Sequence, residues 1–220
     1  MLRTSYYGNS FIGLFFRAND SVLLAPLDAP DKVVDALENE LKVRAVRVSM
    51  ANSNLVGIYT AMNNNGIVLP NVIEESERLE LKKEGLNVFV SRELNNAHGN
   101  NLCVNDKRGI VNPRVDSAER KKMEDALGVE MAPVSLAGHT TVGSACASSA
   151  DGFLAHYAIA EKELQEVEEA LKVPGDKGTV NGGAGFVGLG VVHNKNGFAV
   201  GESTTGFEMG KVAGALGYVK

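Results

Sequence analysis

Apolar residues and glycines recur along this chain with a period of about 44 residues. A glycine returns at intervals of 44, 42, 44 and 45 residues, at Gly13, Gly57, Gly99, Gly143 and Gly188. A leucine two positions before a valine or tyrosine returns with the same period, at Leu41, Leu86, Leu127, Leu171 and Leu216. The last interval is complete only when the residues before Gly13 are joined to those after Gly188. The pattern therefore predicts five copies of one supersecondary unit in a closed ring.

Each copy predicts the order strand, tight turn, strand, helix, strand. In the second copy, an apolar first strand at 55–61 is followed by a turn ending in Asn65-Gly66, a strong hairpin signal. The return strand carries two consecutive apolar residues in every copy, which predicts burial of both faces. We expect one face to look toward the ring centre and the other toward the unit's own helix. The return strands are expected at 22–26, 67–70, 109–113, 152–156 and 197–201.

The helices and closing strands follow in each copy. Asp116 with Glu119, and Thr205 with Glu208, have the spacing of capping boxes at helix starts. Residues 161–172 carry an apolar stripe typical of an amphipathic surface helix. The fifth copy retains only residues 218–220 of its closing strand, so we expect residues 3–7 to supply the missing strand and close the ring. The other closing strands are expected at 43–50, 88–92, 129–136 and 173–180.

Units of this size are too small to hold a core alone, so one domain over residues 1–220 is expected. A net charge of −5 argues against binding nucleic acid mainly through its phosphates. Two cysteines without a CxxC motif are too few for a disulfide scaffold, which fits a reducing cytosol. With no apolar run long enough for a membrane span, we expect a soluble, cytoplasmic protein. The approximate repeats are 8–52, 53–94, 95–138, 139–183, and 184–220 with 1–7.

Candidate chemistry is sparse. Gly183–Gly188 spells GxGxxG, but a dinucleotide site needs a strand before the motif and a helix after it, whereas a strand is expected here. Cys103 and Cys146 lie in equivalent first strands of neighbouring copies and are expected to pack as small hydrophobes, with a nucleophilic role as the alternative. His156 and His193 have no second ligand at a metal-site spacing. We therefore predict no catalytic set, metal or cofactor.

Several segments together resemble the translation initiation factor 6 family, in the shorter form found in archaea. The resemblance spans the chain and is most specific at 141–144, 178–181, 196–197 and 204–206 leading into Glu208, with 66–70 and 103–106 also similar. It implies a pentein fold, in which five ββαβ units form a pseudo-fivefold ring. It also implies a non-enzymatic, monomeric anti-association factor with a role in large-subunit biogenesis. Such a factor binds a ribosomal protein near the sarcin–ricin loop of the large subunit, with little or no direct rRNA contact, and blocks the small subunit.

The resemblance further implies a binding face around the starts of the first strands. The matching positions are Leu14, Ile58, Asn100, Ala145 and Phe186. Ordinary strand packing is the alternative explanation for all five.

An enzyme of the amidinotransferase or arginine-deiminase kind is the alternative function, because those enzymes share the pentein fold. They carry a nucleophilic cysteine in the last unit, and residues 186–220 of this chain contain none. A fold alone does not settle the choice.

Overall fold

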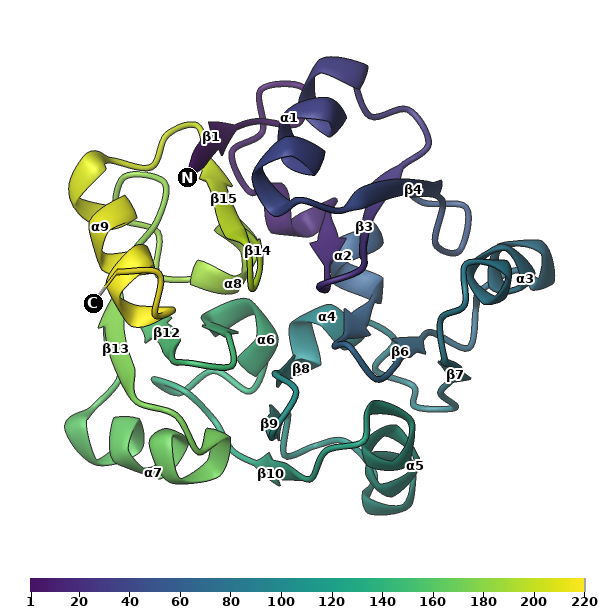
Figure 1. Cartoon of the computed structure of the whole chain (residues 1–220). Helices are drawn as coiled ribbons and strands as arrows, with labels where there is room; N and C mark the ends of the chain where they lie inside the picture. Colours follow the sequence, from purple (N-terminus) through teal and green to yellow (C-terminus); the bar gives the residue numbers. More distant parts are fainter. Residues whose placement is uncertain (220) are drawn as a thin grey trace.

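The computed structural model describes residues 1–219 and shows a mixed α/β protein with five small three-stranded sheets (Figure 1). In each sheet the return strand lies in the middle. It pairs antiparallel with the first strand and parallel with a closing strand. The first strands are β2 (Arg17–Ala18), β5 (Ala61–Met62), β8 (Leu102–Val104), β11 (Cys146–Ser148) and β14 (Val191–Asn194). The return strands are β3 (Val22–Pro26), β6 (Ile67–Leu69), β9 (Gly109–Val111), β12 (Phe153–His156) and β15 (Gly197–Gly201). The closing strands are β4 (Arg44–Val48), β7 (Val88–Val90), β10 (Met131–Pro133), β13 (Gly175–Gly178) and β1 (Leu2–Thr4).

One long helix per unit lies on the outside of the sheets (Figure 1). These helices are α1 (Asp31–Leu41), α3 (Glu75–Lys83), α5 (Ser117–Leu127), α7 (Glu161–Leu171) and α9 (Gly206–Ala215). The Thr205–Glu208 capping box is confirmed, since each side chain accepts a hydrogen bond from the other residue's amide. The box predicted at Asp116 forms only in part. Asp116 caps the amides of Ala118 and Glu119, but the Glu119 carboxylate turns to the amide of Arg92 instead.

The prediction of continuous first strands is wrong, because the first half of each predicted segment is not a strand. A short helical turn precedes each first strand and contains the repeated glycine. The strand itself is only two to four residues long. Short apolar runs do not distinguish a strand from a helical turn, so contacts between units decide the local structure here. The short helices are η1 (Ile12–Leu14), α2 (Val56–Tyr59), α4 (His98–Asn101), α6 (Val142–Ala145) and α8 (Val187–Gly190).

The two ends of the chain meet in one sheet, as the sequence predicts. Leu2 to Thr4 pair in parallel with Ala199 to Gly201, so the N-terminal strand completes the fifth sheet. The pairing begins one residue earlier than expected, and residues 5–7 belong to the turn that follows. Lys220, the last residue of the predicted stub at 218–220, lies outside the described residues.

The core consists of five clusters, each between two neighbouring sheets and one long helix. Along β3, Leu23 and Ala25 pack with the unit's own helix, whereas Val22 and Leu24 pack with the second unit. Both faces of the return strands are therefore buried, as predicted. The expectation that one of them faces the centre is wrong. The first strands are the innermost strands, because their side chains line the central cavity.

Candidate functional site

The repeated glycines pack backbone to backbone at one end of the molecule. A Cβ atom on Gly57 would lie 2.1 Å from the carbonyl oxygen of Gly13, and one on Gly99 would lie 1.9 Å from that of Gly57. The same contact joins Gly143 to Gly99, Gly188 to Gly143 and, closing the series, Gly13 to Gly188. No side chain fits in these gaps, so the contact between units explains why glycine recurs with the period of the repeat.

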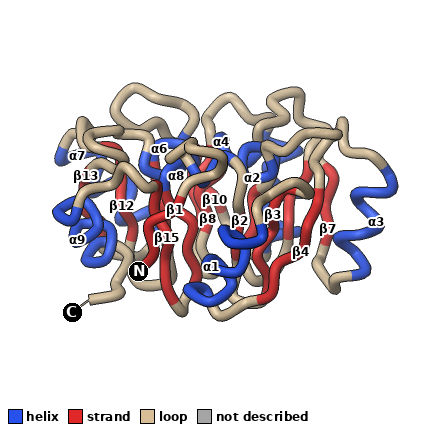
Figure 2. Tube along the Cα trace, turned by 90° about the horizontal axis from the view of Figure 1, so that it is seen from above, coloured by secondary structure: helices blue, strands red, loops and turns tan. Residues whose placement is uncertain are grey.

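The short helices and the loops that lead into them form one end of the molecule (Figure 2), which we call the short-helix face. These loops are residues 5–11, 49–55, 91–97, 134–141 and 179–186. Two of them carry strongly exposed apolar side chains, since Tyr7 is 68% and Leu94 is 87% exposed. The Tyr7 ring packs edge to face on Tyr6 and its hydroxyl donates to the Asp28 carbonyl oxygen, so Leu94 is the more open of the two to a partner.

The structure brings the five predicted contact residues to this face, but it does not expose them equally. Leu14, Ile58 and Asn100 lie on η1, α2 and α4 and are half-buried, as is Phe186 just before α8. Ala145 is fully buried at the end of α6 and packs in the core, so it presents no surface to a partner. It stands two residues after its glycine, whereas Leu14, Ile58 and Asn100 stand one residue after theirs.

Phe186 belongs to an aromatic cluster on this face. Its ring centroid lies 4.9 Å from that of His139 and 5.5 Å from that of His156, which stacks on Tyr157. The Nδ1 atom of His156 accepts a hydrogen bond from the Ala158 amide at 3.1 Å. Burial, and then the neighbouring His139, lower the pKa of His156. His156 thus shapes the turn after β12.

Glutamates near the starts of the long helices hold the turns of this face. Glu208 accepts hydrogen bonds from the Thr179 hydroxyl at 2.7 Å and from the amides of Gly182 and Gly183 at 3.1 and 2.8 Å. Despite its burial, a hydrogen bond from the Thr205 amide together with these three bonds lowers the pKa of Glu208 to about 2. The GxGxxG segment is thus a fixed turn leading into the four-residue α8. It lacks the long helix of a dinucleotide site.

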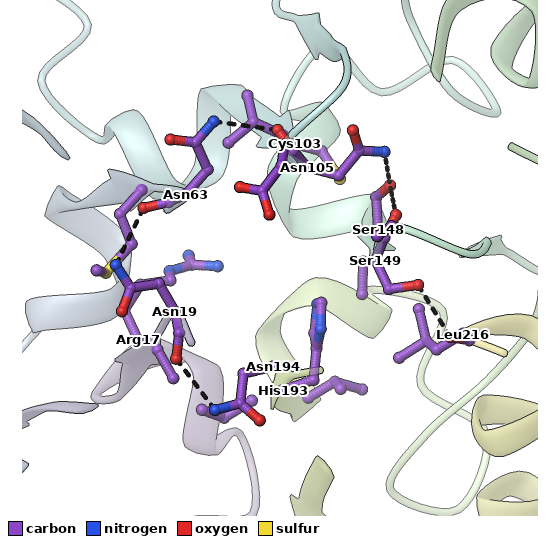
Figure 3. Close-up of a pocket in the computed structure, with 18 of the residues that line it drawn as sticks. Arg17, Asn19, Asn63, Cys103, Asn105, Ser148, Ser149, His193, Asn194 and Leu216 are labelled. Atoms are coloured by element: carbon purple, nitrogen blue, oxygen red, sulfur yellow. Dashed lines mark hydrogen bonds between the residues drawn. The ribbon is translucent and has the colours of Figure 1, made fainter. Parts of the chain in front are cut away.

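The opposite end of the protein opens into a central well lined by a column of polar residues that the sequence analysis missed. Six positions after each repeated glycine stand Asn19, Asn63, Asn105, Ser149 and Asn194 (Figure 3). The side-chain nitrogens of three of these asparagines donate to the main-chain carbonyl oxygen of the asparagine in a neighbouring unit, each at 3.1 Å. These pairs are Asn19 to Asn63, Asn63 to Asn105, and Asn194 to Asn19. The fixed offset from the glycines was the signal that could have revealed them.

The well has a volume of about 160 Å³. Arg17, Cys103, Cys146 and His193 line it below the asparagines, and the short helices close its floor. Both cysteines are free and buried, and burial followed by contact with Cys103 raises the pKa of the Cys146 thiol. A thiol in this state is a poor nucleophile. Within residues 1–219, no group of three His, Cys, Asp or Glu side chains could hold a metal ion.

None of the helices in residues 1–219 is long and apolar enough to cross a bilayer.

Comparison with known proteins places this architecture among related sequences. The model of the eIF-6 family matches residues 1–215. The chain is 36% identical over 211 residues to Translation initiation factor 6 of Pyrobaculum aerophilum, covering 96% of each chain. It is 36% identical over 226 residues to the factor of the same name from Haloquadratum walsbyi, covering 100% of this chain and 98% of the relative. The corresponding factor of Staphylothermus marinus is 34% identical over 220 residues, with 98% and 97% covered.

Proposed function

Because the chain belongs to the eIF-6 family of translation factors, we propose that it binds the large ribosomal subunit and sterically prevents the small subunit from joining. The observation that carries this proposal is the match along almost the entire length of both this chain and its relatives. The same family membership supports a role in large-subunit biogenesis.

The architecture supports a blocking role. The backbone contacts between repeated glycines run from unit to unit and return to the first, which favours the closed pseudo-fivefold pentein ring in one domain. Packing of backbone against backbone leaves little room for relative motion of the units. A rigid body bound at the joining surface excludes the other subunit by its volume alone, so the proposed function requires affinity and shape and no chemical step.

We assign the contact to the short-helix face. Leu14, Ile58, Asn100 and Phe186 retain partial exposure there, and Leu94 adds an exposed apolar side chain in the loop that leads into α4. An apolar centre with polar groups around it is typical of protein–protein contacts. Ala145 is left out of this assignment because it is fully buried.

The charge of the chain favours a protein partner. At −5 overall, it is repelled by rRNA phosphates and attracted to a basic ribosomal protein. A ribosomal protein near the sarcin–ricin loop, as family resemblance suggests, is therefore the proposed contact, with limited or no rRNA contact. A monomer bound in the cytoplasm in a one-to-one ratio is sufficient for this mode of action.

Sedimentation through a sucrose gradient tests the proposal. Purified protein is mixed with separated archaeal subunits at physiological salt, and its distribution is followed by immunoblot. We expect it to travel with the large subunit and to reduce the joined fraction in proportion to its occupancy. Sedimentation with the small subunit, or undiminished joining at full occupancy, would refute the proposal.

The alternative, a guanidino-group-modifying enzyme, lacks support at the position where such enzymes carry their nucleophile. The last unit contains no cysteine, and the two cysteines of the chain are buried thiols in the third and fourth units. Incubation with arginine and related guanidino compounds, followed by assay for citrulline and ammonia, tests this alternative. We expect no product above that of heat-denatured protein.

A further inference from the structure

A positive charge lies at the closed end of the central well. Arg17 is half-buried, and its side chain lines the cavity. Its Nη2 atom donates to the carbonyl oxygen of Gly57 at 2.7 Å, while its buried Nε has no partner among residues 1–219. None of the carboxylates in those residues forms an ion pair with it. Its counterparts in the other units are small or apolar residues, namely Ala61, Cys103, Ala147 and Val192.

His193 adds a second unsatisfied group to the same space. Its buried Nδ1 atom has no partner among the described residues, and its ring points into the well (Figure 3). Burial, followed by the charge of Arg17, lowers the pKa of His193 to about 4, so the ring is neutral at pH 7. A neutral imidazole carries one N–H donor. Arg17 and His193 therefore bring several unused donors to one end of a cavity of about 160 Å³.

Arginine stays protonated at neutral pH, and the partial burial of Arg17 removes part of its hydration, so an anion beside it is favoured. The acidic residues of the well do not supply this anion, since they lie at its opening. There Asp20 is within 3.6 Å of the Lys195 ammonium group, and Asn64 donates to both Asp20 and Asp106. The positive charge of Arg17 is therefore available to an anionic ligand.

We propose that the well binds a small inorganic oxyanion between Arg17 and His193. The planar fork of a guanidinium matches two oxygens of a phosphate or carboxylate, and charge-assisted bonds of this kind are strong. The cavity has room for an ion the size of phosphate together with ordered water. The acidic side chains at the opening favour a singly charged form, such as dihydrogen phosphate, over more highly charged anions. The site opens on the end opposite the short-helix face, so it does not depend on the proposed ribosome contact.

Thermal unfolding in inorganic phosphate tests the site. Wild-type protein is compared with Arg17→Met, and with Lys195→Met as a control that removes the same charge from the rim. Ionic strength is held constant with chloride. At phosphate tenfold above its dissociation constant, we expect Tm to rise by about 3 °C in wild type and Lys195→Met. Phosphate also stabilises proteins generally by exclusion from their surface, and that effect appears in all three. Equal phosphate dependence in the three proteins would overturn the proposal.

A second measurement on the wild type does not depend on the folding of the Arg17 variant. The Nε–H signal of Arg17 is followed by ¹⁵N NMR during titration with phosphate. A shift that saturates, with the same dissociation constant as the thermal effect, supports the site. An unchanged signal up to millimolar phosphate shows that water alone solvates Arg17 and rejects the proposal.

Discussion

The hydroxyl of Tyr218 donates a hydrogen bond to the main-chain carbonyl oxygen of Asn194. In other units the equivalent carbonyl oxygen accepts instead from the asparagine side chain of the preceding unit. At three other junctions the amide of one column asparagine donates to the next member. In the fourth unit the column residue is Ser149, whose short side chain bonds to the carbonyl oxygen of Leu216 and to its own turn at Gly152, without a bond to Asn194. Tyr218 stands where the other units have valine. Serine and tyrosine together thus replace the asparagine–valine combination of the other units.

Tyr218→Phe is expected to lower the free energy of unfolding by about 1 to 3 kcal/mol, because two carbonyl oxygens lose their shared donor. In the Tyr218→Phe background, Ser149→Asn is expected to recover about 1 kcal/mol, since its amide can reach the vacated carbonyl of Asn194. Ser149→Asn alone should gain nothing, because Tyr218 already occupies that acceptor. A double-mutant cycle by urea unfolding measures the coupling, and simple additivity would contradict the exchange of roles.

The glycine contacts predict a sharp difference between two Gly→Ala substitutions. Gly57→Ala places a Cβ atom 2.1 Å from a backbone oxygen of the first unit, which cannot move independently of its unit. We expect a loss of about 3 kcal/mol. Gly210→Ala, on the open side of α9 with nothing within 4 Å, should instead add about 1 kcal/mol through helix propensity. Guanidinium unfolding of both variants provides the comparison, and a tolerated Gly57→Ala would show that the units can separate there.

These contacts also show how far the sequence alone could lead. The period, the hairpin signal at Asn65-Gly66 and the borrowed N-terminal strand were predictable because they depend on local residue preferences and on counting. The short helices were not predictable, since they form where glycine backbones of neighbouring units meet. The placement of Arg17 in the well left only an indirect trace in the sequence, namely one arginine at a position where the other units have small or apolar residues. The burial of Ala145 at the end of α6 was also not predictable, since it depends on packing in the core between units.

Two histidines with a lowered pKa predict a loss of stability in mild acid. Burial lowers the pKa of both His98 and His193 to about 4. In the unfolded chain the pKa is near 6.5. Between these values the unfolded state binds more protons, so stability falls as the pH drops below about 6.5. Each histidine should contribute a loss of about 2 kcal/mol between pH 7.5 and pH 5.

His98→Val separates the contribution of one histidine. Valine occupies the corresponding position in three other units, at Val56, Val142 and Val187. The variant should lose about 2 kcal/mol less than wild type between pH 7.5 and pH 5, as measured by urea unfolding at both values. If the free energy of unfolding of His98→Val falls as much as that of wild type between the two pH values, other groups cause the acid sensitivity.

The last prediction concerns the proposed ribosome contact. Asn100 is a poor probe, because its Oδ1 atom is buried without a partner in the described residues, so a charge there would disturb folding. Leu94 is 87% exposed in a loop of the short-helix face, and Leu94→Glu should leave the free energy of unfolding within about 0.5 kcal/mol of wild type. Affinity for the large subunit should fall at least about tenfold, which corresponds to about 1.4 kcal/mol.

Val219→Glu is the matched control, since it adds the same charge at an apolar position that is 54% exposed near the C-terminus, outside the short-helix face. It should bind like wild type in the same co-sedimentation assay. If both variants bind equally well, the contact lies elsewhere on the surface. If Val219→Glu alone loses affinity, the partner binds the end of the molecule that carries the well and the C-terminus. In that case only a negative charge added at that end interferes with binding.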